Sequence, residues 1–250
     1  MTPHITSHRK GWCSGFHPIT TAGEKKFDTG INFSILKLSP GESYSSTTEE
    51  EVALLHLSGD LKLHMAHQVI NNKRENPFDS PPFAVHMPQN THYDLHAVQE
   101  CELAVCSTPN TKNFAPVIYY PEDTANEHRG KGLVNEACLR WVRTIFDDAN
   151  SDPNTELVLG EVVNMPGRWS SYPPHHHPQP EIYHYRFSDP RGYGHAELGE
   201  QVFKVKQNDT IKIVGSVDHA QCSAPGYAMY YIWVIRHLPN KRYTIPEFTE

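Results

Sequence analysis

The sequence predicts a mainly β protein with few helices, built from two tandem copies of one antiparallel barrel or sandwich domain. Short apolar runs, rich in β-branched and aromatic residues, alternate with Gly, Pro, Asn and Asp along the chain. This alternation is typical of strands joined by turns. Helical periodicity is scarce, and a faint repeat relates the two halves of the chain. At 250 residues, 38% of them hydrophobic, the chain is long enough to bury such a core.

The strand pattern is clearest in eight segments, three in the first half and five in the second. They read INFSILKLS, EVALLHLSG and ELAVCST, then ELVLGEVVN, EIYHYRF, QVFKVKQ, TIKIVG and MYYIWVIR. The best helix candidate is residues 131–149, where apolar residues recur at roughly helical spacing. The same segment could equally form a strand followed by a turn.

The repeat is carried by two short segments. EVALLHLS, which begins at Glu51, aligns with EIYHYRFS, which begins at Glu181, at a constant offset of 130. A repeat of this length indicates two copies of one β domain rather than a solenoid. Residues 108–150 are rich in Pro, Asn and charge, as a connection between two domains would be. We therefore expect a first half over residues 1–115, a connection over 116–150 and a second half over 151–250.

Composition excludes several classes of function. The formal net charge is −7, and no cluster of Lys and Arg interrupts it, so we expect binding to neither nucleic acid nor an anionic membrane. No apolar stretch is long enough to cross a membrane, and the first residues lack the apolar core of a secretion signal. Five scattered cysteines without CxxC spacing fit free thiols in a reducing cytosol. We expect a cytoplasmic protein.

The stretch GRWSSYPPHHHPQPEIYHYRF contains the strongest candidate for a functional site. Alternate residues of a strand face the same side, so His175 and His177 can converge while His176 points away. Glu181 has the same parity, and His219 is the best candidate for a fourth ligand. Three imidazoles and a carboxylate suit Mn, Fe, Zn, Ni or Co. The flanking prolines also allow the opposite interpretation, a solvated loop.

The repeat predicts that only the second half carries this site. Subtracting 130 from 175 and 177 gives Ser45 and Thr47, so the first half is expected to have lost its metal ligands. His92 and His96 then have no partners with which to form a site.

The spacing HxHxxxE, followed by a later histidine, resembles the metal signature of the cupins. Beyond it, GRWSSYPPHHH, EIYHYRF, GYG and SAPGYAMYY resemble the 5-deoxy-glucuronate isomerase family of inositol catabolism over about residues 157–235. The resemblance implies a bicupin, with two β-barrel halves and one divalent metal, Zn or Mn first, in the second half. The segment Val214–Ala220 departs from the family pattern, Asp218 adds a negative charge, and Trp233 replaces an asparagine. These departures lie near the expected site.

By this resemblance the reaction would move a carbonyl from C1 to C2 of a sugar acid, converting 5-deoxy-glucuronate to 5-dehydro-2-deoxy-gluconate. A metal would stabilise the enediolate, and a general base would move the proton. The candidates for the base are Tyr183, Tyr185, Glu161 and a metal-bound hydroxide. Arg168 and Arg186 are the nearest cations for the substrate carboxylate. Hydrogen bonds to hydroxyls could come from Ser170, Ser171, Tyr172 and Gln201, whereas His176 and His184 are expected to be structural.

Two other functions stay open at this point. An Fe-dependent dioxygenase could use the same three-His, one-Glu set, and a paralogue could bind a sugar acid without turnover. A structural cupin is disfavoured because the ligands are retained. Cupins commonly associate through sheet edges, so we expect a homo-oligomer.

Overall fold

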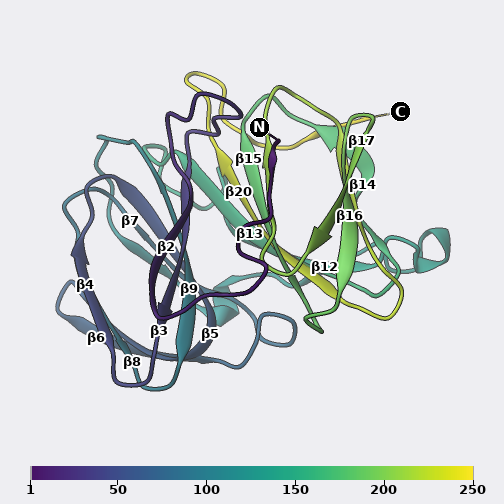
Figure 1. The fold of residues 1–250 in the computed structure, drawn as a ribbon. Coiled ribbons are helices and arrows are strands. Elements are labelled where there is room, and N and C mark those ends of the chain that lie inside the picture. The colour runs from purple at the N-terminus through teal and green to yellow at the C-terminus, as the bar shows by residue number, and fades with distance from the viewer. Residues whose placement is uncertain (1, 250) are drawn as a thin grey trace.

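The computed structural model describes residues 2–249 and is almost entirely β-structure. Its two halves lie side by side (Figure 1). Within the described residues the only helices are two single 3₁₀ turns, η1 (Pro121–Asp123) and η2 (Val134–Glu136). The prediction of a mainly β fold is confirmed. Residues 131–149 form η2 and a strand rather than an α-helix, so the strand alternative is correct.

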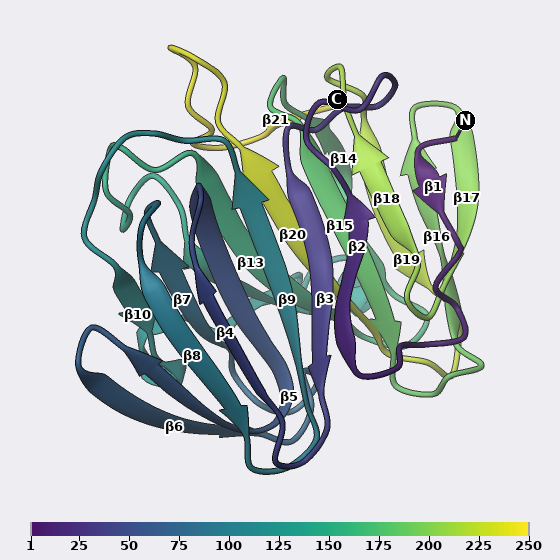
Figure 2. The ribbon, with the colours of Figure 1, turned by 60° about the vertical axis from the view of Figure 1, so that its left-hand side comes forward.

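The first half contains two sheets that share one long strand (Figure 2). One sheet has the order β10-β7-β5-β9-β3-β2, and the other joins β4 and β8 to β5 and β6. The strands are β2 (Gly15–Thr20), β3 (Asn32–Leu38), β4 (Ser43–Thr47), β5 (Glu51–Met65), β6 (Gln68–Arg74), β7 (Phe83–Met87), β8 (His92–Ala97), β9 (Cys101–Thr108) and β10 (Val117–Tyr119).

The second half pairs a seven-stranded sheet, β1-β18-β15-β20-β13-β12-β11, with a five-stranded sheet, β17-β16-β19-β14-β21. The strands are β1 (His4–Ile5), β11 (Glu127–Arg129), β12 (Arg140–Phe146), β13 (Leu157–Asn164), β14 (Trp169–His176), β15 (Glu181–Phe187), β16 (Tyr193–Leu198), β17 (Gln201–Lys206), β18 (Thr210–Ile213), β19 (His219–Ser223), β20 (Met229–Arg236) and β21 (Glu247–Phe248). The short strand β1 joins the sheet of the second half, although it comes from the start of the chain.

The segment expected as a connection is divided between the halves. β10 pairs with β7 in the first half, whereas β11 and β12 extend the sheet of the second half beside β13. The boundaries at 115 and 151 stay a prediction. No helix among residues 2–249 has the length and apolar character needed to span a bilayer.

Three apolar clusters follow from the alternation of side chains along these strands. One fills the first half, one lines the interior of the second half, and the largest lies between the two halves. In β15, Tyr183 and Tyr185 face the interior of the second half, whereas Ile182 packs in the cluster between the halves. The seven-stranded sheet therefore has one face for a site and one face for the interface.

This alternation corrects the alignment of the repeat by one residue. Glu51 has the parity of Ala53 and Leu55, which lie between the halves, whereas Val52 faces the interior of the first half. Val52 is paired with Met87 in β7 and Ser107 in β9, as Glu181 is paired with residues of β18 and β20. Val52 therefore occupies the place of Glu181 in the first half, and a valine offers no ligand atom.

A buried charge cluster joins the halves. The carboxylate of Glu161, on β13, accepts hydrogen bonds from Arg74 at 2.7 Å, Arg143 at 2.8 Å and the Tyr230 hydroxyl at 2.8 Å. Arg74 belongs to the first half, and all four side chains are buried. Because buried charges are tolerated only when they are paired, each guanidinium depends on this one carboxylate.

We predict that Glu161→Gln lowers the free energy of unfolding by about 3 kcal/mol or more, because it leaves two buried guanidinium groups without their counter-ion. Denaturant unfolding followed by circular dichroism measures the change. Glu127→Gln is the matched control, since Glu127 pairs with Arg129 in solvent and exposed pairs contribute about 1 kcal/mol or less. Equal losses in the two variants would contradict the importance of the cluster.

Candidate metal centre

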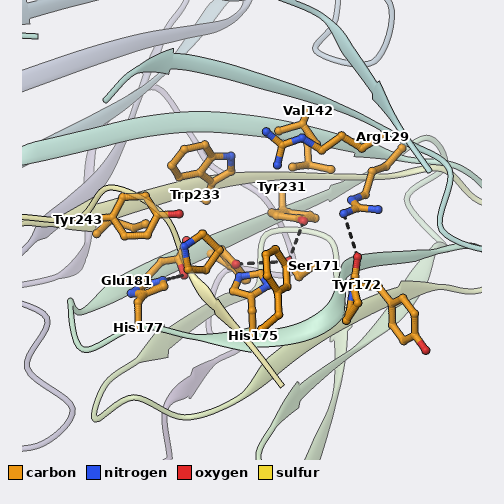
Figure 3. Close-up of a pocket in the computed structure, with 17 residues that line it drawn as sticks. Arg129, Val142, Ser171, Tyr172, His175, His177, Glu181, Tyr231, Trp233 and Tyr243 are labelled. Atoms are coloured by element: carbon orange, nitrogen blue, oxygen red, sulfur yellow. Dashed lines mark hydrogen bonds and ion pairs between the residues drawn. The ribbon is translucent and has the colours of Figure 1, made fainter. Parts of the chain in front are cut away.

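The predicted ligands come from both sheets of the second half. His175 lies near the end of β14 and is directly opposite His219, the first residue of β19. His177 follows β14, and Glu181 is the first residue of β15 in the facing sheet. The side chains of His175, His177 and Glu181 meet at one end of a cavity between the sheets (Figure 3).

Three of the four predicted ligands form a close group. One ligand atom each from His177, Glu181 and His219 lies within 4.8 Å of the other two, and all three residues are buried. Glu181 Oε2 is 3.2 Å from His177 Nε2 and 3.4 Å from His219 Nε2. Among the described residues this is the only such group of His, Cys, Asp and Glu.

Hydrogen bonds at the far side of each ring leave Nε2 free to bind a cation. His177 Nδ1 lies 2.9 Å from the carbonyl oxygen of Gln179, and His219 Nδ1 lies 2.9 Å from that of Val217. A carbonyl can only accept, so Nδ1 donates and a neutral ring presents a lone pair at Nε2. Both lone pairs then face a carboxylate oxygen, and His219 Nε2 has no hydrogen-bond partner within the described structure. A divalent cation would satisfy all three atoms, so the residues fit a metal.

The charge of Glu181 agrees with such a role. Burial alone would raise its pKa, but the His177 and His219 rings beside the carboxylate lower the pKa of Glu181 to about 2. The carboxylate is therefore ionised at neutral pH although it is almost fully buried.

His175 lies beside this group but is not one of its three members. Its ring centroid is 4.4 Å from that of His219 and 6.4 Å from that of His177. Burial, with a contribution from His219, lowers the pKa of His175 to about 4, so the ring is neutral. Its buried Nδ1 has no hydrogen-bond partner among the described atoms. The role of His175 as the fourth ligand stays a prediction.

The cavity has a volume of about 230 Å³. Of the predicted substrate and catalytic residues, Ser171, Tyr172 and Tyr183 line it. Burial, and after it the charge of Glu181, raise the pKa of Tyr183 well above its ordinary value. Ser170 lies just behind the wall, where its hydroxyl is 2.6 Å from the Tyr231 hydroxyl.

Three predicted residues do not line the cavity, so their predicted roles in catalysis or substrate binding are wrong. Glu161 and Arg186 lie on the other face of the seven-stranded sheet, where Glu161 pairs with Arg74 and Arg143, and Arg186 pairs with Glu102 of the first half. Tyr185 faces the interior but beyond the cavity, and its hydroxyl donates to Gln221 at 2.6 Å. None of these side chains can reach a substrate held at His177 and Glu181.

Two further predictions are corrected by position. Arg168 is directed at the backbone oxygen of Asn135, 3.3 Å away, outside the cavity. Gln201 begins β17 and lines a different surface hollow. In contrast, His176 and His184 point away from the ligands, as expected, toward Asp218 and Thr210.

Most of the other residues that line the cavity were not predicted from the sequence. Arg140 and Val142 could have been found by parity if residues 140–146 had been assigned as a strand. Tyr231 lies in a recognised strand and has the parity of Trp233. Ile235 shares that parity, and Val162 lies in another recognised strand. The remaining residues carry no local signal and reach the cavity through tertiary contacts. The missed residues are Arg129, Arg140, Val142, Val162, Tyr231, Ile235, Tyr243, Pro246 and Phe248.

Two of the departures from the family pattern have structural counterparts here. Trp233 lines the cavity directly opposite Gly160, where a Cβ would lie 2.2 Å from the indole ring, so this tryptophan requires a glycine. Asp218 does not face the ligands. Its carboxylate binds His176 at 2.7 Å and Thr249 at 2.5 Å, and so fastens β21 beside β14.

We predict that the protein binds one divalent metal ion per chain and that Glu181→Gln or His219→Ala weakens binding at least about 100-fold. Loss of a ligand should exceed the roughly 10–100-fold effect of losing an outer hydrogen bond to one. Metal content after dialysis, measured by mass spectrometry, tests this. His176→Asn, adjacent to two predicted ligands but turned toward Asp218, should retain the metal. Equal retention in all variants would refute the assignment.

Comparison with known proteins agrees with this fold. The model of the KduI/IolB family matches residues 8–250. A protein named 5-deoxy-glucuronate isomerase from Halalkalibacterium halodurans is 30% identical over 227 residues, which cover 82% of this chain and 81% of the relative. One of the same name from Geobacillus thermodenitrificans is 28% identical over 223 residues, covering 82% and 79%.

Solved structures extend the comparison. The crystal structure of an IolB-like protein from Salmonella typhimurium LT2 is similar with a TM-score of 0.78 and 25% identity, covering 98% of this chain and 91% of that one. A cupin 2 conserved barrel domain protein from Leptotrichia buccalis has a TM-score of 0.56 at 13% identity, covering 93% and 95%. The latter likeness concerns the fold alone and confirms the expected cupin fold. The chain belongs to the KduI/IolB family.

Proposed function

We propose that the protein is a metal-dependent aldose–ketose isomerase that converts 5-deoxy-glucuronate to 5-dehydro-2-deoxy-gluconate, or acts on a closely related sugar acid. The observation that carries the proposal is the buried group of His177, Glu181 and His219 at the end of a small cavity. The names of the relatives in the family support the reaction.

The reaction requires a proton to leave C2 and another to reach C1, while negative charge develops on the oxygens of both carbons. A divalent cation, Zn or Mn first and otherwise Fe, Ni or Co, held by His177, Glu181 and His219 with His175 as fourth ligand, would stabilise that charge. The rings of His177 and His219 are oriented by the carbonyls of Gln179 and Val217, so no reorganisation is needed for binding.

The tyrosine hydroxyls supply proton donors beside this group. Burial raises the pKa of both Tyr183 and Tyr231, so each keeps its proton at neutral pH. Ser171 Oγ lies 3.4 Å from the Tyr183 hydroxyl and 3.2 Å from the Tyr231 hydroxyl, which links the two. We assign Tyr183 as a hydrogen-bond and proton donor to the developing oxyanion rather than as the base, because burial keeps its hydroxyl protonated at neutral pH and a protonated phenol cannot accept the C–H proton.

We predict that Tyr183→Phe lowers kcat by roughly 10²-fold or more, the usual contribution of a positioned acid, with a smaller change in KM. The assay follows formation of the ketone from 5-deoxy-glucuronate by the metal-loaded protein. Tyr185→Phe should change kcat only a few-fold, because that hydroxyl binds Gln221 beyond the cavity.

The same assay separates the alternative functions. Unchanged aldehyde with retained binding would indicate a sugar-acid-binding protein, and oxygen uptake without ketone formation would indicate an oxygenase. Either outcome would overturn the isomerase proposal.

A further inference from the structure

Arg140 is a buried cation in the wall of the cavity. It is the first residue of β12 and is 9% exposed. Its guanidinium donates two hydrogen bonds, from Nη1 to the carbonyl oxygen of Cys138 at 2.7 Å and from Nη2 to that of Tyr172 at 3.2 Å. Both acceptors are neutral, so the positive charge of the guanidinium is not balanced by them. A guanidinium also has five N–H donors, so some of these donors remain available to a ligand.

The other buried arginines of the structure have a carboxylate. Arg74 and Arg143 share Glu161, and Arg186 pairs with Glu102. Within residues 2–249 no Asp or Glu lies at ion-pair distance from Arg140. Since a buried charge without a counter-ion is costly, an anion in the cavity would complete the site.

A second cation stands directly opposite the first. Arg129, on β11, is the cross-strand partner of Arg140 and also lines the cavity. It is half exposed and pairs with Glu127 through Nε at 2.8 Å. Like charges that face each other across two strands are destabilising, and an anion between them would remove this repulsion.

A bulge in β14 lies between this positive end of the cavity and the metal ligands. Ser170 is opposite Gln221 and His175 is opposite His219, so residues 171–174 stand opposite the single residue Ala220. The two ends of the bulge are therefore only two residues apart on β19, roughly 7 Å. Arg140 contacts the bulge at Tyr172.

We infer that Arg140, with Arg129 beside it, binds the terminal carboxylate of the substrate and so fixes which end of the sugar meets His177, Glu181 and His219. This inference rests on the proposed function. The Tyr183 and Tyr231 hydroxyls line the same cavity and are linked through Ser171 Oγ, so they would face the hydroxyl-bearing carbons.

The test compares a charged and a neutral ligand in wild type, Arg140→Met and Arg140→Lys, all metal-loaded. The substrates are 5-deoxy-glucuronate and its analogue with an alcohol in place of the carboxylate. Adipate, a six-carbon dicarboxylate that cannot isomerise, serves as a binding probe in calorimetry. Arg191→Met, which removes an exposed arginine far from the cavity wall, is the control.

We predict that Arg140→Met raises KM for the acid, and Kd for adipate, roughly 10–100-fold, as expected for a charged hydrogen-bonded pair, with kcat changed only a few-fold. Arg140→Lys, which keeps the charge but loses the planar fork, should be intermediate. The neutral analogue should be a poor substrate of wild type and should be little affected by either substitution.

Two results would overturn the inference: an unchanged KM and Kd in Arg140→Met, or equal losses for the acid and the neutral analogue. If Arg140→Met does not fold, the ratio of acid to neutral analogue in Arg140→Lys decides in the same way. If wild type binds adipate in an Arg140-dependent manner but forms no ketone, the isomerase proposal fails and the anion site stands.

Discussion

The organisation of the molecule depends on the two-residue alternation of side chains in the seven-stranded sheet. Within β15, Glu181 and Tyr183 face the cavity, whereas Ile182 packs against the first half and Arg186 pairs with Glu102 there. The same strands therefore present the candidate metal ligands on one side and hold the two halves together on the other. A shift of register by one residue would exchange these faces and lose both.

Much of the candidate metal centre could be predicted because it depends on local parity. His177 and Glu181 lie close in sequence, and the prediction that their side chains point to the same side was correct. His219 was found through its spacing to a recognised motif, and the structure places it beside Glu181 at 3.4 Å. The mainly β fold followed from composition and turn residues alone.

The wrong predictions arose where the direction of a side chain on one strand had to be inferred from the directions on another strand. Glu161 was aligned with the site by its place in the sequence, but its side chain points to the opposite face of the sheet, toward Arg74. Arg140 was missed because its strand was not separated from a helix candidate, and because its approach to Tyr172 depends on the bulge in β14. A bulge adds residues to one strand without any signal in the spacing of apolar residues.

The charge cluster around Glu161 also bears on how the molecule could be dissected. Arg74 lies in the first half and Glu161 in the second, and the largest apolar cluster draws residues from both. A fragment containing the first half alone would carry a guanidinium cation with no carboxylate and a sheet face of Ile, Phe and Leu open to water. We therefore expect the separated halves to be poorly soluble, and the two halves to unfold as one cooperative body rather than as two autonomous ones.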